Sequence, residues 1–245
     1  MSKQPKKQSL DERLLKLTEK QNKRLKDFSF MTSHNVRVLV ANLLPLANMI
    51  TPNEGEEDLV KMIQSIAERL EETVVNINQY LILEQKDLQS KLHPVHLGDA
   101  VYKALHQLNT SVERFEVDVT AAIPSSIHVI GIEHFVINIM IQLLRNAFRF
   151  SEENAIARVQ MLAIEHDDQV VLTIQDNGLG LDIEKYQDKL FTLGSRFHPE
   201  RSEGMGLGLY LSKFQMEAMC GTIAIESTPQ LGTTITLQFK KAKPL

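Results

Sequence analysis

The chain has 245 residues, of which 43% are hydrophobic and 24% are charged, and its formal net charge is −4. This length suits about two ordinary domains, and the composition is globular rather than disordered or fibrous. The acidic balance gives no reason to expect a nucleic acid as a partner. The single cysteine, Cys220, excludes an internal disulfide, and no apolar run approaches the roughly 20 residues of a membrane span. We therefore expect no direct contact with a membrane.

The N-terminal part of the chain is predicted to be a helical hairpin. Apolar residues recur at three-, four- and eight-residue steps over 10–28, and the same stripe continues over 39–50, which predicts one long amphipathic helix. The segment 51–55 (TPNEG) has the composition of a turn, and a second stripe over 59–81 predicts a second helix. A single hairpin leaves much of its apolar stripe exposed. We therefore expect a homodimer in which two hairpins form a four-helix bundle.

The residue pattern changes near Leu92-His93-Pro94, after which predicted helices alternate with short predicted strands. The predicted strands cover 115–119, 159–164, 170–174, 222–225 and 233–239, and the predicted helices cover 133–150 and 206–219. These elements predict an α+β protein. Its helical dimerisation domain spans 1–92, and a two-layer α/β sandwich spans 93–245.

A line of polar residues interrupts the mostly apolar helix predicted at 133–150. Asn138, Gln142, Asn146 and Arg149 follow one another at steps of four, four and three, which places them on one side of the helix. Buried polar groups need partners; amide oxygens suit Mg²⁺ and a guanidinium suits phosphate. A solvent-facing polar stripe is an equally good interpretation of this pattern by itself.

Three glycine-containing segments lie at the ends of predicted elements. Segment 176–180 (DNGLG) follows a strand, so its Asp could accept a hydrogen bond from an exocyclic amine while its glycines let the backbone approach a ligand. An ordinary Asn-Gly turn explains the same residues. Segment 204–209 (GMGLGL) runs into a helix, whose N-terminus can bind an anion. Its spacing differs from that of the P-loop and of the dinucleotide fingerprint. Segment 232–234 (GTT) precedes the last strand and is a weak signal alone.

Together these segments resemble, in order, the motifs of the ATP-binding domain of histidine kinases, within the GHKL ATPase superfamily that includes gyrase and MutL. The resemblance covers essentially residues 95–245. The matching segments are 142–151 for the N box, 176–180 for the first glycine box, 190–192 for the F box, 204–209 for the second glycine box and 232–234 for the third. The α/β sandwich is therefore expected to be of the GHKL ATPase type, with ATP and Mg²⁺ as its ligands.

The resemblance implies a role for each matching residue. Asn146 would bind Mg²⁺, with Gln142 as a second metal ligand, although the family usually has Asn at the latter position. Arg149 would contact phosphate in place of a lysine, Phe150 would pack near adenine, and Asp176 would recognise adenine. Arg196, in an expected ATP lid over 182–203, would contact the γ-phosphate; a solvated lid charge is an equally good interpretation. The other expected nucleotide-binding residues are Gly178, Gly180, Gly204, Gly206, Gly208 and Thr233.

Residues 28–37 (FSFMTSHNVR) resemble the H box of histidine kinases, in its Ser-His-Asn-x-Arg form. On a helical wheel His34 lies nearly opposite the apolar stripe, and a neutral imidazole nitrogen is a suitable nucleophile near neutral pH. The resemblance implies that the catalytic residues are His34, Asn35 and Arg37. Asn35 stands where most members have Glu or Asp, and Val38 stands where many have a Thr or Asn that positions a water. The other seven histidines are interpreted as surface residues without a role.

The sequence thus predicts an ATP-dependent protein histidine kinase that phosphorylates His34 and passes the phosphoryl group to an aspartate of a response-regulator receiver domain. We expect it in the cytoplasm, either alone or as the cytoplasmic part of a longer sensor. Two alternatives stay open. One is a GHKL ATPase of another type, in which the nucleotide drives dimerisation. The other is a non-catalytic dimeric scaffold, which Gln142 and Asn35 favour.

Overall fold

The structure is a computed structural model that describes residues 10–48, 56–84, 87–109, 116–152, 155–198 and 206–243. The chain divides into two compact units, residues 1–77 and 78–245. The second unit begins before residue 93 because the end of the second helix packs on it: Ile82 and Leu83 lie against its core, and Gln79 hydrogen-bonds to Gln215. The domain boundary expected at 92/93 stays a prediction.

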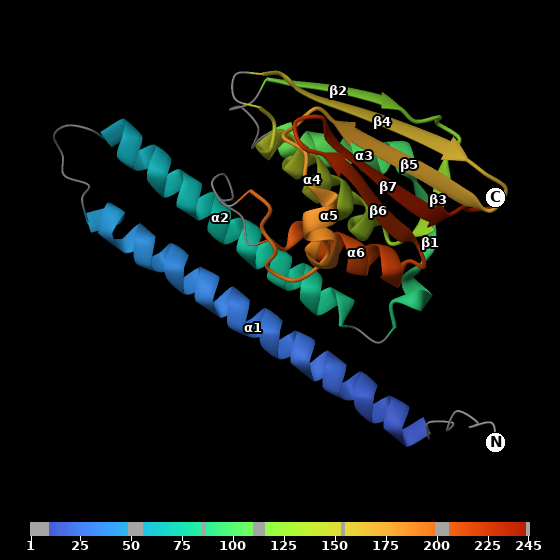
Figure 1. The fold of residues 1–245 in the computed structure, drawn as a ribbon, viewed down its shortest axis with the longest axis horizontal. Coiled ribbons are helices and arrows are strands. Elements are labelled where there is room, and N and C mark those ends of the chain that lie inside the picture. Colours follow the sequence, from blue (N-terminus) through green and yellow to red (C-terminus); the bar gives the residue numbers. More distant parts are fainter. Residues whose placement is uncertain are drawn as a thin grey trace. The chain divides into compact units, whose positions relative to one another are not determined.

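The first unit consists of two long helices, as the apolar stripes predict. Helix α1 spans Leu10–Asn48, and helix α2 spans Glu56–Leu83 and continues into the second unit. The two run side by side (Figure 1). Phe28 and Leu39 of α1 and Ile66 of α2 are 3%, 4% and 7% exposed. The turn predicted at 51–55 lies outside the described residues. No described helix is both long enough and apolar enough to cross a membrane.

The second unit contains a five-stranded sheet with the order β2-β4-β5-β7-β6. Strand β2 pairs parallel with β4, and the other pairs are antiparallel. All five strands were predicted, although Phe115 lies outside the described residues. Their bounds are Val117–Ala122 for β2, Ala157–Glu165 for β4, Gln169–Asp176 for β5, Thr222–Thr228 for β6 and Gly232–Lys240 for β7.

Several elements of the second unit were not predicted, among them two short strands and one helix that packs in the core. Strands β1 (His93–His96) and β3 (His128–Gly131) form a separate antiparallel pair, and four residues are too few to show an alternating pattern. Helix α3 spans Leu97–Asn109. Its buried residues recur at the helical period, so a signal was present in the sequence; they are Leu97, Ala100, Val101, Ala104 and Leu108.

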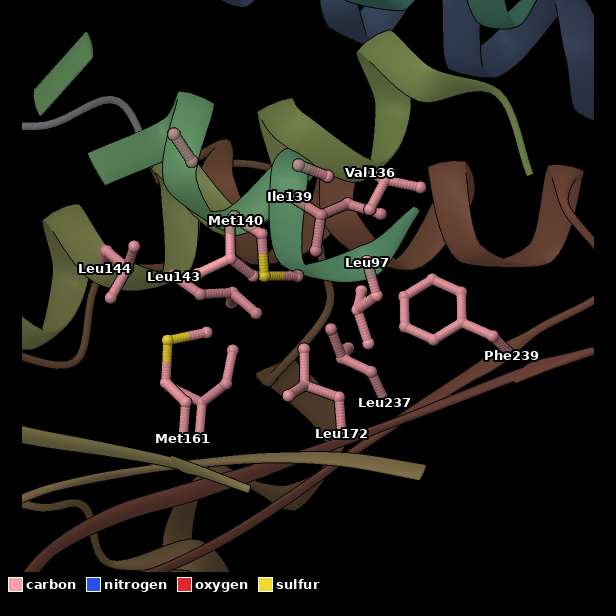
Figure 2. Close-up of a cluster of buried hydrophobic side chains, with 14 of the residues drawn as sticks. Leu97, Val136, Ile139, Met140, Leu143, Leu144, Met161, Leu172, Leu237 and Phe239 are labelled. Carbon is pink, nitrogen blue, oxygen red and sulfur yellow. The ribbon is translucent and has the colours of Figure 1, made fainter. Parts of the chain in front are cut away.

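A layer of helices covers one face of the five-stranded sheet (Figure 1). Helix α4 (Glu133–Arg149) contacts both α3 and α6 (Gly208–Ala218), and the short helix α5 (Ile183–Tyr186) lies near β6. Alternate residues of β4 are buried, as expected for a sheet covered on one face. Figure 2 shows α4 side chains such as Met140 and Leu143 above Met161 and Leu172 of the sheet. The fold is therefore α+β, and the second unit is a two-layer sandwich of helices on a sheet.

Candidate functional site

The polar line on α4 is buried at its N-terminal end, so the solvent-facing interpretation is wrong there. Asn138 and Gln142 are 6% and 3% exposed, whereas Asn146 and Arg149 are half-buried. The Asn138 side-chain amide donates to Oε1 of Gln215 on α6 (3.2 Å). Asn138 therefore has a protein partner rather than a place for a ligand, which leaves the C-terminal half of the line for binding.

The two amide residues in that half, Gln142 and Asn146, lie beside the start of α6. A Cβ atom added to Gly208 would be 3.0 Å from Gln142 Oε1 and 3.7 Å from Asn146 Nδ2. Leu207, which precedes α6, makes no side-chain hydrogen bond to the start of the helix, and the first N–H groups of a helix are suited to an anionic ligand. Amide oxygens next to a helix N-terminus are suited to a phosphate and its Mg²⁺ ion.

Asp176 lies at the end of β5, opposite the start of β7. Its Oδ1 accepts hydrogen bonds from the backbone N–H groups of Gly178 (2.9 Å) and Thr233 (3.1 Å). Burial raises the pKa of the Asp176 carboxyl, and these two hydrogen bonds oppose that shift. Because both donors bond to Oδ1, the second oxygen, Oδ2, is suited to accept an exocyclic amine.

Ser227, at the end of β6, connects the first and third glycine segments. Its hydroxyl donates to Gly232 O (2.8 Å), accepts from Leu181 N–H (2.8 Å), and lies 2.9 Å from Thr233 Oγ1. Thr233 therefore contacts both Ser227 and Asp176. Sequence reasoning missed Ser227, and no motif marks it, since its role comes from the pairing of β6 with β7.

The glycines of these segments allow protein backbone, as well as any ligand, to approach closely. Gly180 has φ +61°, and a Cβ atom there would be 2.0 Å from Thr228 O. Gly206 has φ +67°, and its Cβ would be 2.5 Å from Ser195 O. A Cβ atom on Gly178 would be 2.6 Å from Phe150 O. A side chain at any of the three would push these segments apart. Gly204 lies outside the described residues.

The aromatic ring expected near adenine, Phe150, has an unexpected neighbour. The ring of His198 lies 5.3 Å from it, at an interplanar angle of 38°. Nε2 of His198 is 2.9 Å from Gly180 O. His198 is therefore not an isolated surface residue, since it is half-buried and contacts two candidate site residues. Arg196, two residues earlier, is exposed.

His34 lies on the face of α1 that the sequence predicts. It is exposed, whereas Phe28 and Leu39 are buried. Arg37 is also exposed and lines a groove of about 600 Å³ with Ser33, Val40 and Ile77. The side chain of Asn35 lies outside the described residues. His34 and the nucleotide-site candidates belong to different compact units.

Residues 131–243 match the model of the family described as histidine kinase-, DNA gyrase B- and HSP90-like ATPase. The sensor histidine kinase GacS of Pseudomonas protegens is 25% identical over 226 residues, which cover 89% of this chain and 25% of GacS. The chain thus spans about a quarter of the length of that relative.

Solved structures share the fold. The histidine kinase AdeS of Acinetobacter baumannii superposes with a TM-score of 0.63 at 18% identity, covering 85% of this chain and 96% of AdeS. Full-length ShkA, solved in complex with AMPPNP, superposes with a TM-score of 0.61 at 16% identity, covering 89% of this chain and 46% of ShkA. At these identities the likeness shows the fold alone.

Proposed function

Residues 131–243 match the family of histidine kinase-, DNA gyrase B- and HSP90-like ATPases, and we propose that the chain is a histidine kinase catalytic core that phosphorylates its own His34 with ATP. The phosphoryl group then passes to an aspartate of a response-regulator receiver domain. The observation that best supports ATP as the donor is the pairing of two features in one domain. A half-buried carboxylate is held by backbone N–H groups, and two amides lie beside a helix N-terminus.

Each end of the nucleotide has a proposed set of contacts. Asp176 Oδ2 accepts a hydrogen bond from the exocyclic amine of adenine; guanine carries a carbonyl at this position and is discriminated against. Gln142 and Asn146 offer amide oxygens to Mg²⁺, which when bound neutralises charge on the phosphates. Arg149, with the N–H groups at the start of α6, contacts the phosphate oxygens.

The transfer step uses the neutral imidazole of His34. A ring nitrogen forms a bond to the γ-phosphorus, the bond from phosphorus to the bridging oxygen breaks, and ADP leaves with that electron pair. The imidazole releases its N–H proton to solvent. An Asn at position 35 is no base at neutral pH, but its amide oxygen can accept from a ring N–H and select the tautomer. In the second transfer an aspartate oxygen of the receiver replaces this nitrogen on phosphorus.

The active form is proposed to be a homodimer in which two hairpins pair into a four-helix bundle. Val40 of α1 and Val74 of α2 are 39% and 52% exposed, and a second hairpin would cover such apolar surface. We place the activity in the cytoplasm, where ATP is available. The single cysteine suits a reducing compartment.

Incubation with ATP labelled on the γ-phosphate tests the proposal. The wild type should acquire a label that acid removes and alkali does not, as expected for a phosphorylated histidine. His34→Ala should lose the label and keep ATP binding, because His34 lies on α1 and not among the nucleotide-site candidates. His166→Ala, at an exposed residue after β4, is the matched control and should be labelled normally.

The alternatives give different results in the same assay. Label that persists in His34→Ala would show that another residue is the acceptor. ATP hydrolysis without protein labelling would identify an ATPase of another type, and ATP binding with neither activity would identify a scaffold. Asp176→Ala should abolish labelling by weakening ATP binding.

A further inference from the structure

Residues 194–198 of the expected lid are held to the rest of the domain at both ends. At one end the backbone N–H of Gly194 donates to Gly206 O (3.2 Å). At the other end Nε2 of His198 lies 2.9 Å from Gly180 O. Arg196 is midway between these two contacts, and it is exposed. The contacts of Gly194 and His198 therefore fix the backbone on both sides of Arg196, the only Arg or Lys of residues 194–198.

His198 makes two contacts, one with Gly180 and one with Phe150, and these two residues belong to connected segments. Because a carbonyl oxygen only accepts, Nε2 must carry a proton and donate to Gly180 O. The His198 ring also packs on Phe150 at 5.3 Å. Phe150 and the segment around Gly180 are joined to each other, since Leu179 N–H donates to Phe150 O (2.9 Å). Both contacts of His198 thus hold the lid segment against the end of α4.

The Gly194 hydrogen bond connects the segment that carries Arg196 to the residues that lead into α6, the proposed phosphate end of the nucleotide site. Arg196 is two residues from Gly194, and Gly208 is two residues from Gly206, the hydrogen-bond partner of Gly194. Two residues of extended chain span at most about 7 Å, so Arg196 and Gly208 each lie within about that distance of the residue that makes this hydrogen bond. A long guanidinium side chain beside a helix N-terminus is suited to a phosphate oxygen.

We propose that His198 is a positioning residue that fixes segment 194–198 and thereby directs Arg196 to the γ-phosphate of ATP. This inference rests on the proposed function. Without His198, the segment keeps its contacts at Gly194 and Ser195 and the ring contact of Phe197 with Tyr186 (5.1 Å), but it loses its attachment to Gly180 and Phe150. Ordering Arg196 on binding then costs more conformational entropy. His198 does not itself contact the reacting atoms.

The affinities for ATP and ADP, measured by calorimetry, and the initial rate of self-labelling test this role. His198→Ala should weaken ATP binding roughly three- to tenfold, the size of one net hydrogen bond, and should weaken ADP binding less. His198→Gln, which keeps an N–H donor, should recover part of the loss. Arg196→Ala should remove the preference for ATP over ADP, and adding His198→Ala to it should change ATP affinity little further, because both substitutions remove the same interaction.

His166→Ala is the matched control, and thermal unfolding of each variant monitors the fold. Equal losses for ATP and ADP in His198→Ala, losses that add fully to those of Arg196→Ala, or tighter ATP binding would each overturn the proposal. If the wild type binds no ATP, or Asp176→Ala changes nothing, the proposed function itself fails. If Asp176→Ala abolishes binding while His198→Ala behaves like His166→Ala, only the role of His198 fails.

Discussion

At the end of β5 the Asp176 carboxyl accepts two backbone N–H groups, and enough protein surrounds it for burial to raise its pKa. A raised pKa means that the folded chain holds this proton more tightly than the unfolded chain does. Ionisation of Asp176 therefore lowers the free energy of unfolding as the pH rises through the folded-state pKa. The proposed contact with adenine needs the ionised, acceptor-only form, so binding and stability make opposite demands on this residue.

Asp176→Asn should consequently stabilise the fold at neutral pH while weakening ATP binding. The Asn side-chain oxygen can still accept from Gly178 and Thr233, but the amide carries no charge to desolvate. The gain in thermal stability should shrink as the pH falls through the folded-state pKa of Asp176. Unfolding temperatures across a pH series, with ATP calorimetry at neutral pH, provide the measurement.

The exposed Asp118 of β2 offers a control for this prediction, and Asp118→Asn should leave both quantities nearly unchanged. An Asp176→Asn variant that is less stable than the wild type at neutral pH would show that a charged carboxylate is required to hold the two N–H groups.

Hydrogen-bonded side-chain amides connect helices α4 and α6. Gln215 is fully buried; it accepts from Asn138 and donates to Gln79 Oε1 (3.0 Å). These bonds connect the end of α2 with the two helices that carry candidate nucleotide-site residues. A buried amide without a partner loses its hydrogen bonds to water and forms none in their place. The amides of Asn138, Gln215 and Gln79 therefore stabilise the fold only when both hydrogen bonds are made.

Gln215→Leu should therefore lower the free energy of unfolding by about 1–3 kcal/mol, since it leaves the Asn138 amide buried and unsatisfied. Adding Asn138→Leu should restore part of the loss, because an apolar pair has no unmet hydrogen bonds. Urea unfolding of both single variants, the double variant and the wild type measures this. Gln160→Leu, on an exposed position of β4, is the control. The pairing would be contradicted if the double variant lost more free energy of unfolding than the two single variants lose together.

Helix α1 presents His34 and Val38 one turn apart on its exposed side; Val38 is 41% exposed. A valine holds no attacking water, so we expect weak phosphatase activity toward a phosphorylated receiver domain. Val38→Thr should raise that activity, and Val75→Thr on α2, where the valine is also 41% exposed, should not. The measurement is the loss of label from the phosphorylated partner over time. Brisk dephosphorylation by the wild type would show that another residue positions the water.

The whole molecule is expected to behave as a dimer in solution, with twice the chain mass of 27.8 kDa. Val40→Glu together with Val74→Glu should halve the mass measured by sedimentation, since two buried charges oppose pairing of the hairpins. The control is Leu162→Glu with Ile164→Glu, at exposed apolar positions of β4, and it should stay dimeric. Unchanged mass in the hairpin variant would exclude this face as the interface.

Local patterns were sufficient for most elements of the fold. Helices α1, α2, α4 and α6 and the strands of the five-stranded sheet follow from periods of 3.6 and 2 that each segment contains by itself. Strands β1 and β3 could not be predicted in this way, because a strand of four residues contains only two repeats of the alternating polar and apolar pattern. The buried end of the polar line on α4 was undecided for a different reason: its partner, Gln215, is 77 residues away.

The sequence by itself identified the resemblance to histidine kinases and the candidate site residues, because both depend on residue types in a fixed order along the chain. Tertiary structure alone decided which of these residues meet. The pairing of β5 with β7 brings Asp176 to Thr233, 57 residues apart, and the return of the lid brings His198 to Gly180 and Phe150. Neither contact has a local signal, since a hydrogen bond between distant segments depends on how strands and helices pack, and the sequence around one partner does not identify the other.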